Sequence, residues 1–156
     1  FAKKVKISYN NPMNKIIYAG SFDPITNGHS WLVDQALELF DEVVILIANN
    51  VSKKYYFSLE ERQSFIEHQF KGKRVSVVIL QNEYVAQYAK DNNIKYMLRG
   101  LRNSVDFEYE TDVYNMNQII APEIKTIYLR SPAHITEISS SKVKSLVGFP
   151  RWKKHI

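Results

Sequence analysis

The stretch YAGSFDPITNGH, residues Tyr18 to His29, separates a short apolar run from an amphipathic one. The run before it, KIIYA at residues 15–19, predicts a buried strand because it is apolar and carries two adjacent β-branched residues. The apolar residues after it recur at helical spacing, as Leu32, Ala36, Leu39 and Phe40. The quoted stretch is therefore predicted to be the turn from a first strand to a first helix.

The same order of strand and helix recurs along the rest of the chain. Apolar runs predict four further strands, at residues 42–48, 75–80, 95–100 and 125–130. Further helices are predicted from Ser58, whose capping-box partner is Glu61, at 84–92 and at 139–147. A longer helix that ends before Pro122 carries an apolar stripe of Val105, Tyr109, Met116 and Ile120.

Five strands that alternate with helices through short connections predict an α/β fold. We expect a Rossmann-like, doubly wound, five-stranded parallel sheet with helices on both faces. Ligands of such sheets bind beyond the carboxyl ends of the strands. Polar clusters follow the first, second, fourth and fifth strands, so we expect them to lie together at that edge of the sheet. The order of the strands is not readable from the pattern.

The length and composition indicate one domain. A chain of 156 residues with 45% hydrophobic residues can bury a sizeable core. We expect residues 13–156 to form a single domain, with residues 1–12 an extension ahead of a natural start at Met13. There is no cysteine, and no apolar run approaches the ~18 residues of a membrane span, so a cytoplasmic location without membrane contact is expected.

The net charge of +5 comes from the two ends of the chain. Six basic residues and no acids lie in residues 1–12 and 147–156, which leaves −1 for residues 13–146. A nearly neutral body without basic stripes interleaved by aromatic residues argues against nucleic acid as a partner.

Four polar clusters have both an ordinary and a functional interpretation. The first turn is either a plain connection, capped by Asn27 with His29 on the surface, or a phosphate cradle opened by its glycines. The lysine pair after the second strand and the RGLR stretch, residues 99–102, are either solvated loops or cations on the ligand edge. The three serines of residues 139–141 either cap a helix or bind phosphate.

The full string GSFDPITNGH resembles the G-x-F-D-P-x-T-x-G-H signature of the nucleotidylyltransferase superfamily, with Thr26-Asn27-Gly28-His29 as its T-x-G-H core. RGLR followed by DFEYE, residues 106–110, is similar to the phosphopantetheine adenylyltransferase family within it. The resemblance runs from Lys15 to about Val147. Serine stands at position 21 where threonine is more usual, which keeps the hydroxyl.

The resemblance implies transfer of AMP from ATP to 4′-phosphopantetheine, giving dephospho-coenzyme A and pyrophosphate. It implies in-line attack without a covalent intermediate, Mg²⁺ as cofactor with no protein ligand assigned to it, and a homohexamer. His29 would stabilise the transferring phosphate, assisted by Ser21, Lys53 and Arg99. The implied phosphopantetheine site is Ser21, Lys53, Val85 and Arg99. The implied ATP site is Ser21, Phe22, His29, Gly100, Leu101, Arg102, Glu110, Ile135, Thr136, Glu137, Ile138, Ser139, Ser140 and Ser141.

Two rival functions stay open at this stage. A sister enzyme would use the same turn with nicotinate mononucleotide or glycerol phosphate as acceptor. A module that binds nucleotide or nucleic acid without catalysis would release no pyrophosphate.

Overall fold

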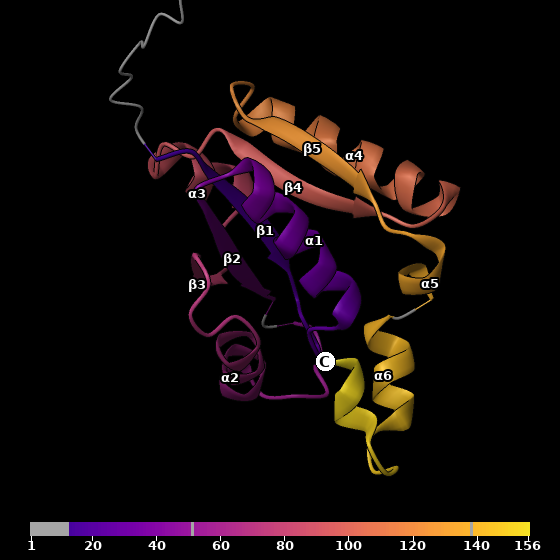
Figure 1. Ribbon diagram of the computed structural model, residues 1–156. Helices are drawn as coiled ribbons and strands as arrows, with labels where there is room; N and C mark the ends of the chain where they lie inside the picture. Colours follow the sequence, from indigo (N-terminus) through magenta and orange to yellow (C-terminus); the bar gives the residue numbers. More distant parts are fainter. Residues whose placement is uncertain (1–12, 51, 138) are drawn as a thin grey trace, which may run out of the picture.

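The computed structural model describes residues 13–50, 52–137 and 139–156 (Figure 1). Its five strands are β1 (Lys15–Gly20), β2 (Glu42–Asn49), β3 (Val75–Gln81), β4 (Tyr96–Leu101) and β5 (Lys125–Arg130). Each lies where the apolar runs predicted it, within one or two residues at each end. The proposed extension, residues 1–12, lies outside the described residues.

The strands form one sheet in the order β3-β2-β1-β4-β5, and every neighbouring pair is parallel. The predicted fold class is thereby confirmed. The chain builds outward from β1 to β3, then crosses back to place β4 on the other side of β1. The carboxyl ends of β1 and β4 therefore form the point at which the winding reverses, where doubly wound sheets bind their ligands.

Helices cover both faces of the sheet. Helix α1 (Asn27–Leu39), drawn in front of the sheet in Figure 1, and α2 (Leu59–Gln69) enclose one core, in which Ile16, Val43 and Leu98 are buried. Helix α3 (Val85–Asp91) and the end of α4 (Ser104–Ile120) enclose the other, around Ile17 and Met97. Successive residues of a strand point to opposite faces, so central strands apolar at every position supply both cores.

Two apolar stripes differ from the prediction. Leu39 is 65% exposed, because α1 ends there and the chain turns so that Phe40 enters the core instead. On α4, Val105, Tyr109 and Met116 are exposed by 71, 64 and 53%. The helix exists as predicted, but of this stripe only Ile120, at the end of α4, packs against the sheet core, while the other three residues are exposed.

The C-terminal segment contains two short elements that the sequence did not predict, α5 (Ala133–Thr136) and the 3-10 helix η1 (Trp152–His155). Between them lies the predicted helix α6 (Ser140–Leu146). Figure 1 shows this segment leaving the sheet after β5 and running below the carboxyl ends of the strands. It is fixed there because Trp152 stacks on Phe57, with ring centroids 5.8 Å apart, and Asn27 donates to the backbone carbonyl of Lys154.

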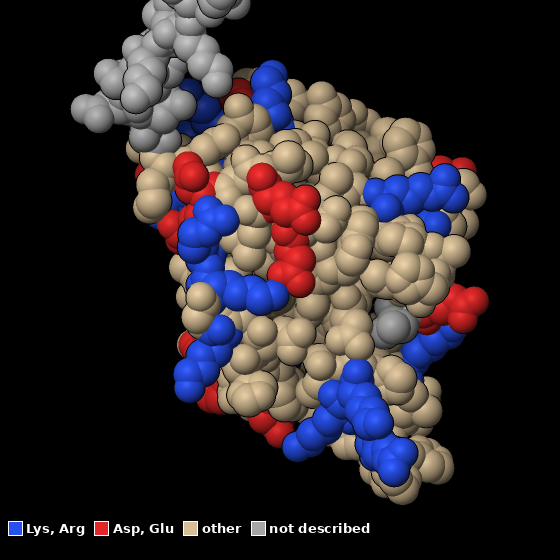
Figure 2. Space-filling model, in the orientation of Figure 1, with Lys and Arg blue, Asp and Glu red and all other residues tan. Residues whose placement is uncertain are grey.

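Basic side chains gather on the lower part of the face shown in Figure 2, over this C-terminal segment, where η1 carries Lys153 and Lys154. Elsewhere on that face the two signs of charge are mixed.

None of the helices in the described part of the chain has both the length and the apolar character needed to cross a membrane.

Gly100 packs tightly against α1 at the point where β4 passes it. A Cβ atom at this position would lie 2.5 Å from Cδ1 of Leu32, a side chain only 5% exposed. We expect Gly100→Ala to lower the free energy of unfolding by about 1–3 kcal/mol, as overpacking does. Urea unfolding measures this, and in a Leu32→Ala background the cost should nearly vanish. An equal cost in both backgrounds would contradict the explanation.

Candidate active site

A pocket of about 870 Å³ opens at the carboxyl edge of the sheet. Its wall brings together the turn after β1, the loops after β2 and β3, the end of β4, the first turns of α4 and the start of α6. Most of the predicted site residues line it: Ser21, Phe22, His29, Lys53, Val85, Arg99, Gly100, Arg102, Glu110, Ile135, Ser139, Ser140 and Ser141. The structure thus collects at one edge side chains up to 120 residues apart.

Two predicted positions are not on this wall, and two more lie wholly or partly outside what the structure describes. Leu101 ends β4 and Glu137 follows α5, but neither lines the pocket. Thr136 closes α5, and its side chain lies outside what is described. Ile138 lies outside the described residues altogether. Their roles stay predictions.

His29 is held by the start of α1. Thr26, rather than the predicted Asn27, is the N-cap residue, and His29 at the third helical position completes a capping box with it. The backbone N–H of Thr26 donates to Nδ1 of His29 at 3.0 Å. Since Nδ1 accepts this bond, the neutral ring carries its proton on Nε2. His29 therefore presents a single N–H donor on the side away from the helix start.

The imidazole of His29 stays neutral at physiological pH. It lies among the rings of Phe22 and Tyr18, with centroids 5.3 and 6.1 Å away. Burial lowers the pKa of His29 to about 4, and the positive charge of Arg102 adds to this effect. Burial among the same groups raises the pKa of Tyr18. His29 is consequently suited to donate a hydrogen bond to an anion without being an acid or a base near pH 7.

The protonation state of His29 gives a direct prediction. In ¹⁵N NMR spectra at pH 6, its Nε2 should be protonated and its Nδ1 bare, and the ring should begin to titrate only as the pH falls toward 4. The unfolded chain takes up this proton near pH 6.5, so His29 makes the fold less stable as the pH falls from about 6.5 to 4. The signal is assigned by its loss in His29→Gln. A midpoint near 6.5 would contradict the burial argument.

Arg99 and Glu110 form a paired cation and carboxylate at the end of β4. Nε and Nη2 of Arg99 donate to the two carboxylate oxygens at 2.6 and 2.5 Å, and Nη1 donates to the carbonyl of Ala19 at 3.3 Å. Glu110, buried on α4, was predicted to contact adenosine, yet here both its oxygens hold Arg99. Burial works to lower the pKa of Arg99, but the bonds and charge of Glu110 raise it above its usual value. Arg99 is therefore a fixed cation.

Arg102 adds a second guanidinium to the wall. Its Nε and Nη2 donate to the carboxylate of Asp106, in the first turn of α4, at 2.9 and 3.0 Å. The side-chain hydrogen bond from Arg102 lowers the pKa of Asp106, so that the pair is ionised near pH 7. Arg102 is less buried than Arg99, which leaves it more free to turn toward a ligand.

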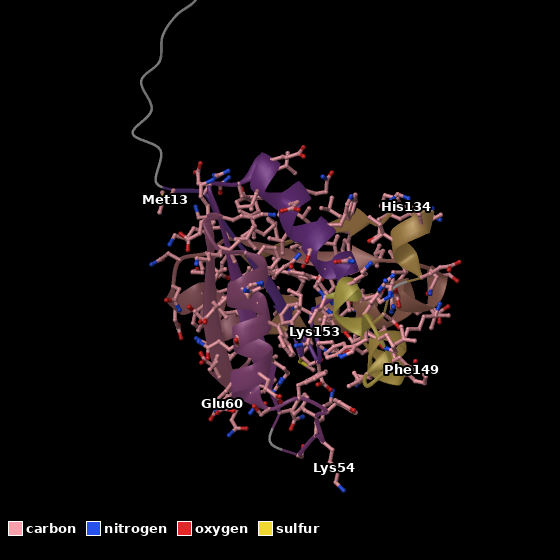
Figure 3. The ribbon with its side chains drawn as sticks, turned by 60° about the horizontal axis from the view of Figure 1, so that its bottom comes forward. Met13, Lys54, Glu60, His134, Phe149 and Lys153 are labelled. Atoms are coloured by element: carbon pink, nitrogen blue, oxygen red, sulfur yellow. The ribbon has the colours of Figure 1, made fainter. Side chains whose placement is uncertain are left out.

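Of the two lysines after β2, only Lys53 lines the pocket. Its backbone N–H donates to the carbonyl of Asn50, which closes a tight turn. Figure 3 shows Lys54 pointing away from the protein at the tip of this loop. No ion pair holds Lys53 within the ranges that the structure covers. Its ammonium group is thus available to an anion in the pocket.

The serines at the start of α6 differ in what they bond. Ser139 is the N-cap and accepts from the backbone N–H of Lys142. Ser140 donates to the carbonyl of Pro24 at 2.8 Å, which ties α6 to the turn after β1. Ser141 is exposed on the pocket wall. The capping interpretation is thus confirmed for Ser139, and phosphate binding by Ser141, which lines the pocket, stays a prediction.

Asp23 ties together three segments that carry pocket residues, the turn after β1, the loop after β2 and α6, a role that the sequence did not predict. It is 4% exposed, its carboxylate accepts from the backbone N–H groups of Tyr56 and Phe57, and Lys144 of α6 donates to it at 3.1 Å. Burial favours a raised pKa for Asp23, but these donors outweigh it and lower the pKa. Asn49, Asn82 and Tyr109 also line the pocket and were not predicted. The two asparagines follow strands at the ligand edge, which was the available signal.

No group of three or more histidine, aspartate or glutamate side chains in the described ranges is placed to hold a metal ion. Three carboxylates among the described residues line the pocket: Asp106 and Glu110 are paired with arginines, and Glu83 stands alone on the exposed loop after β3. A divalent cation here would therefore rely on ligand oxygens and water for its coordination, as Mg²⁺ commonly does.

Comparison with known proteins places the chain in a family. The cytidylyltransferase-like family model matches residues 17–146. Proteins named phosphopantetheine adenylyltransferase are 37% identical in Chromobacterium violaceum, over 90% of this chain and 87% of that protein, and 43% identical in Flavobacterium johnsoniae, over 86% and 88%.

The fold recurs at lower identity. Nicotinic acid mononucleotide adenylyltransferase of Plasmodium falciparum, solved with NaAD, superimposes with a TM-score of 0.65 at 17% identity, covering 93% of this chain and 91% of that one. The fold, the family match over most of the chain and the identity to the named relatives all indicate the same family. The chain belongs to the cytidylyltransferase-like family and, within it, to the phosphopantetheine adenylyltransferases.

Proposed function

We propose that this protein transfers AMP from ATP to 4′-phosphopantetheine and releases dephospho-coenzyme A and pyrophosphate. The relatives named for this activity support it. The observation that carries it in the structure is the convergence of His29, Lys53, Arg99 and Arg102 on one pocket at the switch point of the sheet. Two substrates that both carry phosphate need such a concentration of cations and N–H donors.

The proposed reaction needs no general base. The acceptor is a phosphate monoester, whose oxygen is nucleophilic at neutral pH. It attacks the α-phosphorus of ATP in line, and the bond to the pyrophosphate oxygen breaks as the new P–O bond forms. The obstacle is the mutual repulsion of two polyanions, so the protein contributes chiefly position and electrostatic stabilisation.

Each side chain then has a defined task. Lys53, Arg99 and the hydroxyl of Ser21 hold the acceptor phosphate, and Nε2–H of His29 donates to the α-phosphate as negative charge develops on it. A neutral donor suits this step, because it remains bonded throughout and releases no proton. Val85 contacts the pantetheine arm.

The remaining residues bind ATP. Phe22 and residues 100–102 contact the adenosine part, and residues 135–141 take the triphosphate, with the exposed hydroxyl of Ser141 directed to the leaving pyrophosphate. Glu110 supports this site through Arg99, since both its oxygens accept hydrogen bonds from that guanidinium. Mg²⁺ would bind oxygens of the triphosphate and reduce its charge, and the sparse carboxylates of the wall fit an ion that keeps water ligands.

An assay of pyrophosphate release tests the proposal. Purified protein receives ATP and Mg²⁺ with 4′-phosphopantetheine, nicotinate mononucleotide or glycerol phosphate in separate reactions. We expect release with phosphopantetheine only, and none without added Mg²⁺. Release with another acceptor would identify a sister enzyme, and none with any acceptor would reject the function.

We also propose that the protein assembles as a homohexamer in the cytoplasm. The exposed apolar residues of α4, Met116 and Ile119, suit burial against a second copy, because large exposed apolar patches mark interaction surfaces. Light scattering coupled to size exclusion should report a hexamer, and Ile119→Glu should dissociate it. A monomer at micromolar concentration would contradict this assembly.

The lack of cysteine agrees with the proposed location in the cytoplasm, a reducing compartment.

A further inference from the structure

Arg62 of α2 is a buried cation that has no role in the site described above. It is 1% exposed and heads the fully buried side chains in volume. No carboxylate forms an ion pair with it in the part of the chain that the structure describes. Glu60 interacts weakly with its charge from the exposed face of the same helix, where water screens the interaction. A buried guanidinium without a paired carboxylate is rare enough to need a reason.

One contact of Arg62 stays at the start of its own helix, where Nε donates to the carbonyl of Ser58 at 3.4 Å, and the others lead to the pocket. Nη1 donates to the carbonyl of Ser21 at 2.9 Å, and Nη2 donates to Oδ1 of Asn49 at 2.7 Å. The guanidinium carbon lies 4.0 Å from the ring centroid of Tyr55. Ser21, Asn49 and Tyr55 line the pocket from the turn after β1, the end of β2 and the loop after β2. One side chain thus braces three parts of the wall from behind.

Among the residues that the structure describes, the direct partners of the Arg62 guanidinium are neutral oxygen atoms and a π-face. Such groups satisfy the N–H donors, but they leave a net positive charge in a region of low dielectric constant. That charge lowers the energy of an anion held against Ser21, on the other side of the same turn.

We infer that Arg62 is a positioning residue for the phosphate of the acceptor: it fixes the turn at Ser21 and supplies a buried positive charge that the phosphate balances. This rests on the proposed function. Removal of the charge should therefore weaken binding of the phosphorylated acceptor and leave binding of the same molecule without its phosphate unchanged.

Calorimetric titration of wild type and Arg62→Gln with 4′-phosphopantetheine and with pantetheine tests this difference. We expect the Kd for 4′-phosphopantetheine to rise roughly tenfold or more in Arg62→Gln, and the Kd for pantetheine to change by less than about twofold. A purely structural role would weaken both ligands alike. Arg62→Lys keeps the charge but cannot brace Ser21 and Asn49 together, so it should retain the preference for the phosphorylated ligand and lose kcat.

Arg74 provides the matched control. Its guanidinium donates to the carbonyls of Leu37, Phe40 and Asp41, and it lies at the amino end of β3, at the opposite edge of the sheet. Arg74→Gln should reduce stability without altering the preference for the phosphorylated ligand.

Three results would overturn the inference. These are an unchanged Kd for 4′-phosphopantetheine in Arg62→Gln, equal losses for both ligands, or loss of the preference in Arg62→Lys. If Arg62→Gln does not fold, the ligand preference of Arg62→Lys alone tests the inference. A wild type that binds neither ligand would instead reject the proposed function, and the inference with it.

Discussion

His29→Ala is expected to lower kcat by roughly 10²–10³, the cost of losing one preorganised donor to a developing anion. The KM for both substrates should change little, because the donor acts on charge that appears during transfer. Burial lowers the pKa of His29 to about 4, so the ring is neutral at pH 7 in the protein without substrates. Steady-state pyrophosphate release at saturating ATP and acceptor measures the loss.

His29 also caps α1, so its removal affects the fold as well as the chemistry. Losing the acceptor for the N–H of Thr26 should cost about 1 kcal/mol of stability. His29→Gln separates the two effects, because glutamine at this position can still accept in a capping box. This variant should recover stability and remain slow. Near-normal turnover in His29→Ala would show that the imidazole does not touch the reacting phosphate.

Arg99→Ala is expected to raise the KM for phosphopantetheine roughly 10–100-fold, the value of a hydrogen bond to a charged group, with a smaller change in the KM for ATP. The protein should also lose about 3 kcal/mol of stability, because Glu110 is left buried without its cation. Initial rates at varied acceptor and a urea denaturation curve give the two quantities.

The double variant Arg99→Met with Glu110→Gln is the control for that experiment. It removes both charges together, so the stability should recover while the KM for phosphopantetheine stays high. Glu110→Gln alone should raise this KM by less, since Arg99 remains but is held less firmly. An acceptor KM unchanged in Arg99→Ala would contradict the assignment of Arg99 to the acceptor phosphate.

The sheet was predictable because its strands are apolar on both faces. Runs such as residues 42–48 indicate strands buried on both faces, and the amphipathic segments between them fit crossover helices. The position of the site followed from the same pattern, because polar residues that come directly after parallel strands must meet at one edge.

What the sequence did not predict depends on contacts between distant segments. The apolar stripe of α4 has helical spacing, but spacing does not tell whether the chain itself or another molecule covers it. Asp23 and Arg62 are of residue types that usually lie at the surface. They are buried here because backbone groups from other segments form hydrogen bonds with their charged groups. The ion pair of Glu110 with Arg99 joins a helix to a strand, and such a contact cannot be predicted from a local sequence pattern.

A crystal structure of the protein with 4′-phosphopantetheine and a non-hydrolysable ATP analogue tests the central claim most directly. We predict the α-phosphate within hydrogen-bonding distance of Nε2 of His29, with the acceptor phosphate beside Lys53 and Arg99 and in line with the leaving oxygen. A nucleotide bound outside this pocket, with His29 facing only solvent, would contradict the account.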